Sequence, residues 1–147
     1  MLIGEYQNKI GEKNRIALPK KFREILGNKV IVTKGYEQCL IVVSLNQWEE
    51  IIKPITQKPF TLSPVRDTSR FIIGSAYEAD LDNQGRFVIS QVLKEYASLK
   101  EEVSFLGLLN WVEIWDKNNW DERKEYIAKN SSSIAEQLNI QKVNGVS

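Results

Sequence analysis

The residues Y-Q-N-K-I-G-E-K-N-R-I-A-L-P-K-K-F at positions 6–22 decide the fold, because their pattern occurs twice in the chain. The second occurrence reads Y-E-A-D-L-D-N-Q-G-R-F-V-I-S-Q-V-L at positions 77–93. A shift of 71 positions (86 − 15) places Arg15 on Arg86, and each arginine comes just after a tight polar turn. The chain therefore presents the same basic residue in two matching local settings.

The match continues farther along the chain, where residues 40–48 align with residues 112–120 at a shift of 72 positions. A single one-residue gap reconciles the two shifts. A repeat unit of about seventy residues is too long for a solenoid and indicates a duplicated small domain. A paired presentation of arginine is typical of a binding protein rather than of an enzyme.

Gly, Pro and Asn residues mark the ends of the expected elements in both copies. The strands expected in the first copy are residues 4–10, 15–18, 29–34 and 39–43, and those in the second are 76–81, 86–89, 103–108 and 112–115. A helix is expected after each second and fourth strand, so each copy has the order β-β-α-β-β-α. One copy holds too few apolar positions for a core of its own, and two copies packed about a pseudo-twofold axis would share one.

The segment between the copies is expected to be a connector. Pro54, Pro59 and Pro64 favour extended structure, followed by a helix that Ser63 caps. The spacing of Ser133 and Glu136 predicts one more short helix after the second copy, and a loose tail is expected from Ile140. The expected divisions are a first repeat at 1–53, a connector with a helix at 54–74, a second repeat at 75–130, and a short helix with a tail at 131–147.

The absence of histidine removes more catalytic chemistry from this chain than any other feature of the sequence. No Ser-His-Asp or Cys-His pair can form, and the single cysteine, Cys39, makes a zinc or other transition-metal site unexpected. Neither a G-x-x-x-x-G-K-[ST] loop nor a G-x-G-x-x-G turn is present. We therefore expect no catalytic residue, no metal, no cofactor and no small-molecule substrate.

The net charge of +1 conceals an asymmetry along the chain. Residues 1–34 hold eight basic and three acidic residues, which gives +5, and the remainder holds twelve basic and sixteen acidic residues, which gives −4. A local basic surface of this kind suits a polyanion. The longest aliphatic runs, 39–43 and 105–109, are too short to cross a bilayer, and the N-terminus lacks the pattern of a secretion signal. A soluble, cytoplasmic protein that binds no membrane is expected.

The order of strand, D-x-x-G-R turn, strand and helix resembles the SpoVT/AbrB family of swapped-hairpin proteins. The residues that carry this resemblance are 82–86 in the second copy and 13–23 in the first. Two such units in one chain of this length resemble the MraZ family of regulators, and the match covers residues 1 to about 130. The resemblance implies an α+β fold, mostly β, in which the two units form a pseudo-twofold double-hairpin barrel with peripheral helices.

The resemblance also implies a DNA-binding regulator or repressor that assembles into a ring of identical subunits at the nucleoid. Its double-stranded target would be short G-rich direct repeats upstream of the division and cell-wall gene cluster. Arg15 would be the main DNA contact, and Arg86 its counterpart in the second copy. The other residues expected at the DNA are Lys13, Asn14, Lys20, Lys21 and Arg23. Asp82 and Gly85 are expected to shape the second turn.

The first copy departs from the family pattern at two positions. Gly11 stands where Asp is usual, and Asn14 stands where Gly is usual. Asn14 can take positive φ at modest cost. For Arg86 a structural role remains open, because Asp80 and Asp82 flank it and could pair with it.

Two other functions are compatible with these residues. The same fold could serve as a protein-interaction module without DNA, either antitoxin-like or a scaffold, although such a module would need a longer disordered tail. A carboxylate-dependent hydrolase using Asp80 and Asp82 is the third hypothesis, since the two lie on one face of a strand.

Overall fold

The computed structural model describes residues 1–143, which fall into two compact units that meet between Lys117 and Asn118 in the sequence. All the described strands lie in the first unit. They are β1 (Ile3–Lys9), β2 (Arg15–Ala17), β3 (Lys29–Lys34), β4 (Leu40–Ser44), β5 (Tyr77–Asp80), β6 (Arg86–Val88), β7 (Glu102–Leu108) and β8 (Val112–Asp116). The helices are η1 (Glu12–Asn14), α1 (Lys20–Leu26), α2 (Leu45–Thr56), α3 (Ser63–Ile72), α4 (Gln91–Tyr96) and α5 (Lys117–Val143). The α+β class expected from the sequence is confirmed.

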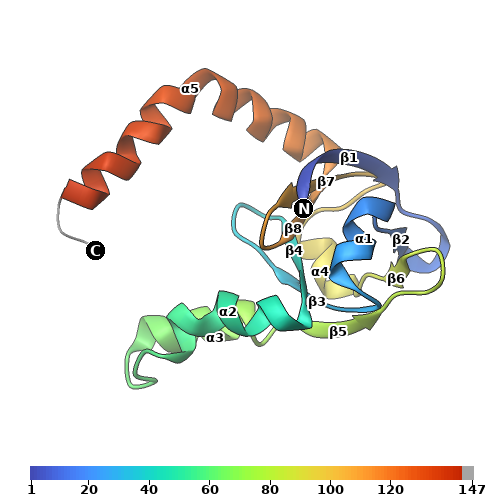
Figure 1. Ribbon diagram of the computed structural model, residues 1–147, viewed down its shortest axis with the longest axis horizontal. Helices are drawn as coiled ribbons and strands as arrows, with labels where there is room; N and C mark the ends of the chain where they lie inside the picture. The colour runs from blue at the N-terminus through green and yellow to red at the C-terminus, as the bar shows by residue number, and fades with distance from the viewer. Residues whose placement is uncertain (144–147) are drawn as a thin grey trace. The chain divides into compact units, whose positions relative to one another are not determined.

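The strands of the first unit form two antiparallel sheets (Figure 1). The larger sheet has six strands in the order β1-β7-β8-β4-β3-β5, and the smaller one consists of β2 and β6. In the repeat, β1, β3 and β4 of the first copy correspond to β5, β7 and β8 of the second. If each strand is replaced by its counterpart, the strand order of the large sheet is simply reversed. The sheet therefore has the symmetry of the sequence repeat.

The register of the strands gives the position of the pseudo-twofold axis. In the small sheet Ile16 pairs with Phe87, its own counterpart in the repeat, and the flanking pairs Arg15–Val88 and Ala17–Arg86 mirror each other. In the large sheet the self-matching pair is Ile41 with Glu113. Both pairs obey the 71- and 72-residue shifts found in the sequence.

Each copy completes the sheet of the other. β1 pairs with β7 of the second copy, and β5 pairs with β3 of the first, so neither first strand forms a hairpin with the strand that follows it. The core is shared in the same way. Phe22 from the first copy and Phe105, Ile89 and Leu93 from the second are almost completely buried in one cluster. The expectation that one copy alone lacks a core agrees with this arrangement.

The connector between the copies is more helical than expected. Helix α2 continues through Pro54 to Thr56, and α2 and α3 run side by side (Figure 1). Pro54 lies in the last turn of α2, where a missing donor costs only one hydrogen bond. Residues 57–62 form turns rather than extended chain, because Lys58 N donates to Ile55 O at 3.1 Å. Ser63 is the first residue of α3 and makes no capping hydrogen bond, so its predicted role was wrong.

The second unit contains helix α5, and the expected separate helix from Ser133 is not formed. α5 is continuous across Ser133 to Val143, because residues 117–143 contain no Gly or Pro that would break a helix. Residues 140–143 continue the helix, and the rest of the expected tail, residues 144–147, lies outside the described residues. No helix within residues 1–143 is both long and apolar enough to cross a membrane.

The close approach of the start of β1 to β7 leaves no room for a side chain at Gly107. A Cβ there would lie 2.6 Å from Ile3 N and 2.7 Å from the Leu2 carbonyl carbon. Because these contacts are with the backbone of the strand that pairs with β7, we expect Gly107→Ala to lower the free energy of unfolding by about 1–3 kcal/mol, the usual cost of overpacking.

Urea denaturation of the variant beside Gly11→Ala tests this expectation. A Cβ on Gly11 would lie 3.6 Å from Arg15 O, an ordinary contact, so this control should unfold close to the wild-type midpoint. Equal midpoints for the two variants would show that β1 does not approach β7 as described.

Candidate nucleic-acid interface

Arg15 begins β2 and extends an exposed side chain from the small sheet. Its guanidinium makes no hydrogen bond or ion pair with any residue from 1 to 143. The backbone of Arg15 is held firmly, because its carbonyl oxygen accepts a hydrogen bond from Gly11 N at 2.7 Å. The backbone of Arg15 is therefore fixed, while its guanidinium has no partner among residues 1–143.

The turn before Arg15 is strained. Asn14 has a φ of 58°, as its side chain type allowed us to expect, and Lys13 has a φ of 59°. Positive φ is uncommon for a residue other than Gly and costs free energy, so the surrounding structure must hold it. Sequence reasoning missed the strain at Lys13, because nothing in a lysine side chain indicates a left-handed backbone.

Arg86 occupies the matching position in β6 and is held differently. Its Nε donates to Asp82 Oδ2 at 2.8 Å, and both side chains are a little over 40% exposed (42% and 41%). Asp82 Oδ1 accepts two further hydrogen bonds, from Gln84 N and Arg86 N, each at 2.9 Å. One carboxylate therefore braces the turn and holds the arginine that follows it.

The same contacts lower the pKa of the Asp82 carboxyl to about 2, with the backbone hydrogen bond from Arg86 as the largest cause and its side-chain hydrogen bond as the next. Asp82 is then ionised at neutral pH and has no proton to donate. Asp80 lies 3.7 Å from Lys29 Nζ. The lowered pKa of Asp82 is the opposite of what a general acid needs, and Asp80 is paired with Lys29, so the two carboxylates do not suit the hydrolase hypothesis.

Helix α1 reaches over to the second turn. The Arg23 side chain lies directly on Gly85, where a Cβ would come within 2.5 Å of Arg23 Cδ, and Gly85 itself has a φ of +73°. Helix α4 makes the matching contact with the first turn, because Lys94 Nζ donates to Asn14 Oδ1 at 2.8 Å. Each helix thus supports the turn of the other copy through a basic residue.

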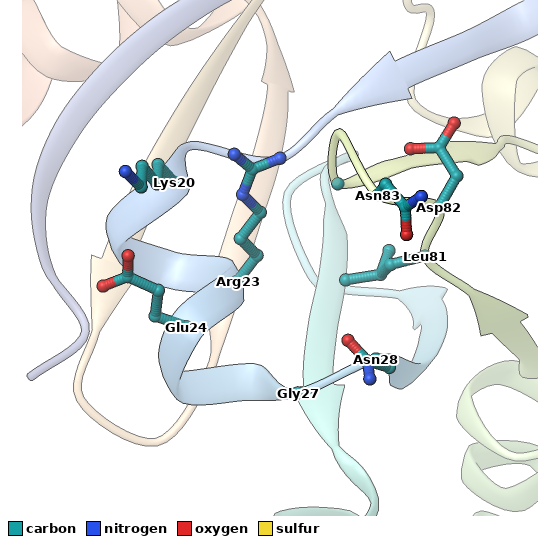
Figure 2. A pocket seen from close by; sticks show the side chains of 9 residues that line it. Lys20, Arg23, Glu24, Gly27, Asn28, Leu81, Asp82 and Asn83 are labelled. Carbon is teal, nitrogen blue, oxygen red and sulfur yellow. The ribbon is translucent and has the colours of Figure 1, made fainter.

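Two polar clefts contain most of the predicted site residues. Figure 2 shows the first, with Lys20, Arg23 and Glu24 of α1 on one side and residues 81–83, which lead into the β5–β6 turn, on the other. Its volume is about 410 Å³. The second, of about 390 Å³, contains both Arg15 and Arg86.

The remaining predicted residues lie outside these clefts. Lys13 and Lys21 are exposed but line neither cleft, and Asn14 is half-buried against α4.

The bond between Asp82 and Arg86 predicts a particular pH dependence for Asp82→Asn. A carboxyl whose pKa is lowered on folding stabilises the folded state above its ordinary pKa of 3.8, and this contribution is lost as the pH falls towards the folded value of about 2. We expect the variant to melt below the wild type at pH 7, by a difference that stays constant down to about pH 4 and shrinks below it. Thermal unfolding followed by circular dichroism at several pH values measures this. A difference that is as large at pH 2.5 as at pH 7 would contradict the proposed ion pair.

Comparison with known proteins gives a consistent result over the whole chain. The model of one family, described as "MraZ protein, putative antitoxin-like", matches twice, at residues 1–71 and 72–142. A transcriptional regulator MraZ of Acetivibrio thermocellus is 41% identical over 138 residues, covering 94% of this chain and 96% of that protein. The MraZ of Clostridium beijerinckii is 42% identical over 139 residues, covering 95% and 97%. The MraZ of Caldicellulosiruptor bescii is 43% identical over 120 residues, covering 82% and 84%. With two family matches in register with the structural repeat, and relatives of this identity along nearly its full length, the chain belongs to the MraZ family.

Proposed function

We propose that the protein is a transcriptional regulator that binds double-stranded DNA in a sequence-specific way through Arg15. The observation that carries the proposal is the exposed guanidinium of Arg15, which has no partner among residues 1–143 although its backbone is anchored. An exposed cation held ready in this way suits an anionic ligand that the protein itself does not supply. The names of the relatives, which are transcriptional regulators, support DNA as that ligand.

The geometry suits the major groove of B-DNA, which admits a two-stranded β-ribbon. β2 and β6 form such a ribbon, and Arg15 lies at its end. An arginine fork can hydrogen-bond to O6 and N7 of guanine, and lysines nearby can contact phosphates without reading sequence. Lys13, Lys20 and Lys21 are exposed for that purpose, whereas Arg23 is half-buried and combines phosphate contact with support of the second turn.

We further propose that several subunits act together. One subunit offers one free arginine at the ribbon, and a bidentate contact is worth only about 1–3 kcal/mol of discrimination. Linked subunits raise the affinity without new contacts. A ring of identical subunits on short G-rich direct repeats, upstream of the division and cell-wall gene cluster, meets this need. The first repeat, residues 1–53, would face the DNA. The two sheets would close behind it as a double-hairpin barrel. The protein would act as a cytoplasmic, nucleoid-associated repressor.

The alternative is a protein-interaction module. It is favoured by the words "antitoxin-like" in the description of the family and by the separate second unit that contains α5. A module of this kind would bind its partner with Arg15 removed, and its DNA affinity would not depend on that residue.

Arg15→Ala should weaken binding to the DNA upstream of the protein's own gene by about 1–3 kcal/mol per contact, because one bidentate base contact is lost. Fluorescence anisotropy with labelled duplexes from that region, beside a random duplex, measures both affinity and specificity. The matched control is Arg70→Ala, which removes an exposed arginine of α3 whose one ion pair among residues 1–143 is with Asp67 on its own helix. The control should bind like the wild type.

The outcome that contradicts the proposal is equal affinity of the wild type, Arg15→Ala and Arg70→Ala for the upstream duplex. Binding should also weaken with salt. A plot of the logarithm of the association constant against the logarithm of the salt concentration should have a slope of roughly −0.9 for each phosphate neutralised.

Oligomerisation should be visible in solution. Sedimentation velocity at micromolar concentration should show a species several times the 16.9 kDa of one chain. A monomer alone at that concentration would count against the cooperative mechanism, because one arginine per particle cannot give useful affinity.

A further inference from the structure

The short helices α1 and α4 each contact the turn of the other copy, and the two contacts are built from different pairs of residues. α1 places Arg23 on Gly85. α4 places Lys94 on Asn14. The 71-residue shift of the repeat relates the two contacts, because the helix cations are at positions 23 and 94 and the turn residues at positions 14 and 85. One pseudo-symmetric contact therefore occurs in two forms, arginine with glycine and lysine with asparagine.

The space at each turn matches the pair that occupies it. Gly85 and Asn14 both have a left-handed backbone, with φ of 73° and 58°. A Cβ on Gly85 would lie 2.5 Å from Arg23 Cδ, so the arginine occupies the space that a larger turn residue would need. In the first copy the turn residue has a side chain, and Lys94 Nζ donates to Asn14 Oδ1 at 2.8 Å. A packing contact in the second copy is thus a hydrogen bond in the first.

The side chain of Asn14 is directed at α4. Its Oδ1 accepts from Lys94, and its Nδ2 donates to Gln91 Oε1 at a longer 3.4 Å. Both Asn14 and Lys94 are half-buried, and a hydrogen bond from an ammonium group is stronger than one between neutral groups. A residue other than glycine needs such support to keep a positive φ. Because Arg15 follows Asn14 directly, this support acts on the backbone from which the arginine extends.

We infer that Lys94 is a positioning residue for DNA binding: by holding Asn14 in its left-handed conformation, it fixes the direction in which Arg15 leaves the turn. The inference rests on the proposed function and deepens it, because it gives the second copy a part in a contact that the first copy makes. Asn14, which the sequence placed at the DNA, then acts through Arg15 and does not touch the duplex.

The physical mechanism is a shift in population. Without the hydrogen bond from Lys94, Asn14 can relax to a negative φ, which residues other than glycine prefer. The turn then holds Arg15 correctly in only a fraction of the molecules. The apparent dissociation constant for DNA rises by the inverse of that fraction.

The first test is Lys94→Met, which keeps an unbranched side chain and removes the donor. We expect affinity for the upstream duplex, measured by fluorescence anisotropy, to fall about three- to tenfold, the result of a competent fraction of about a third to a tenth. The matched control is Lys58→Met, the same change at an exposed lysine between α2 and α3, which should bind like the wild type. Binding of Lys94→Met at wild-type affinity would overturn the inference.

Lys94→Met also removes a positive charge that could attract phosphates directly, and a double-mutant cycle with Asn14→Gly separates the two effects. Glycine takes a positive φ without support, as Gly85 does in the second copy, so Asn14→Gly should bind within about twofold of the wild type. In that background Lys94→Met should cost little further affinity. Equal weakening in both backgrounds would show a direct charge effect and overturn the inference. A large loss from Asn14→Gly alone would overturn it too, because Asn14 would then contact the duplex itself.

Amide hydrogen exchange tests the same contact without DNA. Gly11 N donates to Arg15 O at 2.7 Å and closes the first turn, while Asp82 N donates to Arg86 O at 3.0 Å in the second. Lys94→Met should speed exchange of the Gly11 amide and leave that of the Asp82 amide unchanged, which also shows that the variant is folded. An unchanged rate at Gly11 would contradict the role of Lys94.

These outcomes distinguish failure of the inference from failure of the proposed function. If Arg15→Ala binds the upstream duplex like the wild type, the proposed function fails, and the role of Lys94 in DNA binding fails with it. If Arg15→Ala binds weakly but Lys94→Met binds like the wild type, DNA binding by Arg15 stands and only the role of Lys94 is wrong.

Discussion

The exchange of backbone hydrogen bonds between the two turns is the constraint on which the rest of the first unit depends. Leu18 N donates to Gly85 O at 3.0 Å, and Ile89 N donates to Asn14 O at 2.9 Å. Each strand that leaves one turn is therefore tied to the turn of the other copy. The exchange brings β2 against β6, makes the core common to both copies, and places both arginines on one ribbon. A single copy could satisfy neither its sheet nor its core.

On this common backbone, the two turns are held in different ways. The ion pair of Asp82 with Arg86 is local and exposed, and such pairs contribute little to stability. The Asp82 carboxylate mainly braces the second turn, through hydrogen bonds from Gln84 N, Arg86 N and Arg86 Nε. The first copy replaces the bracing carboxylate with a strained turn at Lys13 and Asn14. Strain of this kind is often found at functional sites, and here it holds Arg15 in place without consuming its charge.

Much of this arrangement could be predicted from the sequence, because the repeat carries long-range information. The order of the elements and the shared core follow from two copies that cannot fold alone, whereas the pairing of β1 with β7 and of β5 with β3 was not predicted. Local patterns were less reliable. The capping-box spacing at Ser133 lies inside a continuous helix, where no Gly or Pro opposes helix formation, and Pro54 is tolerated near the end of α2. Composition indicated that Arg86 could pair with an acidic neighbour, but only the coordinates distinguish Asp82 from Asp80.

A structure of the protein bound to a duplex from the DNA upstream of its own gene tests the central claim most directly. The account predicts that the Arg15 guanidinium lies within hydrogen-bond distance of a base edge in the major groove. A complex in which Arg15 points into solvent would contradict it.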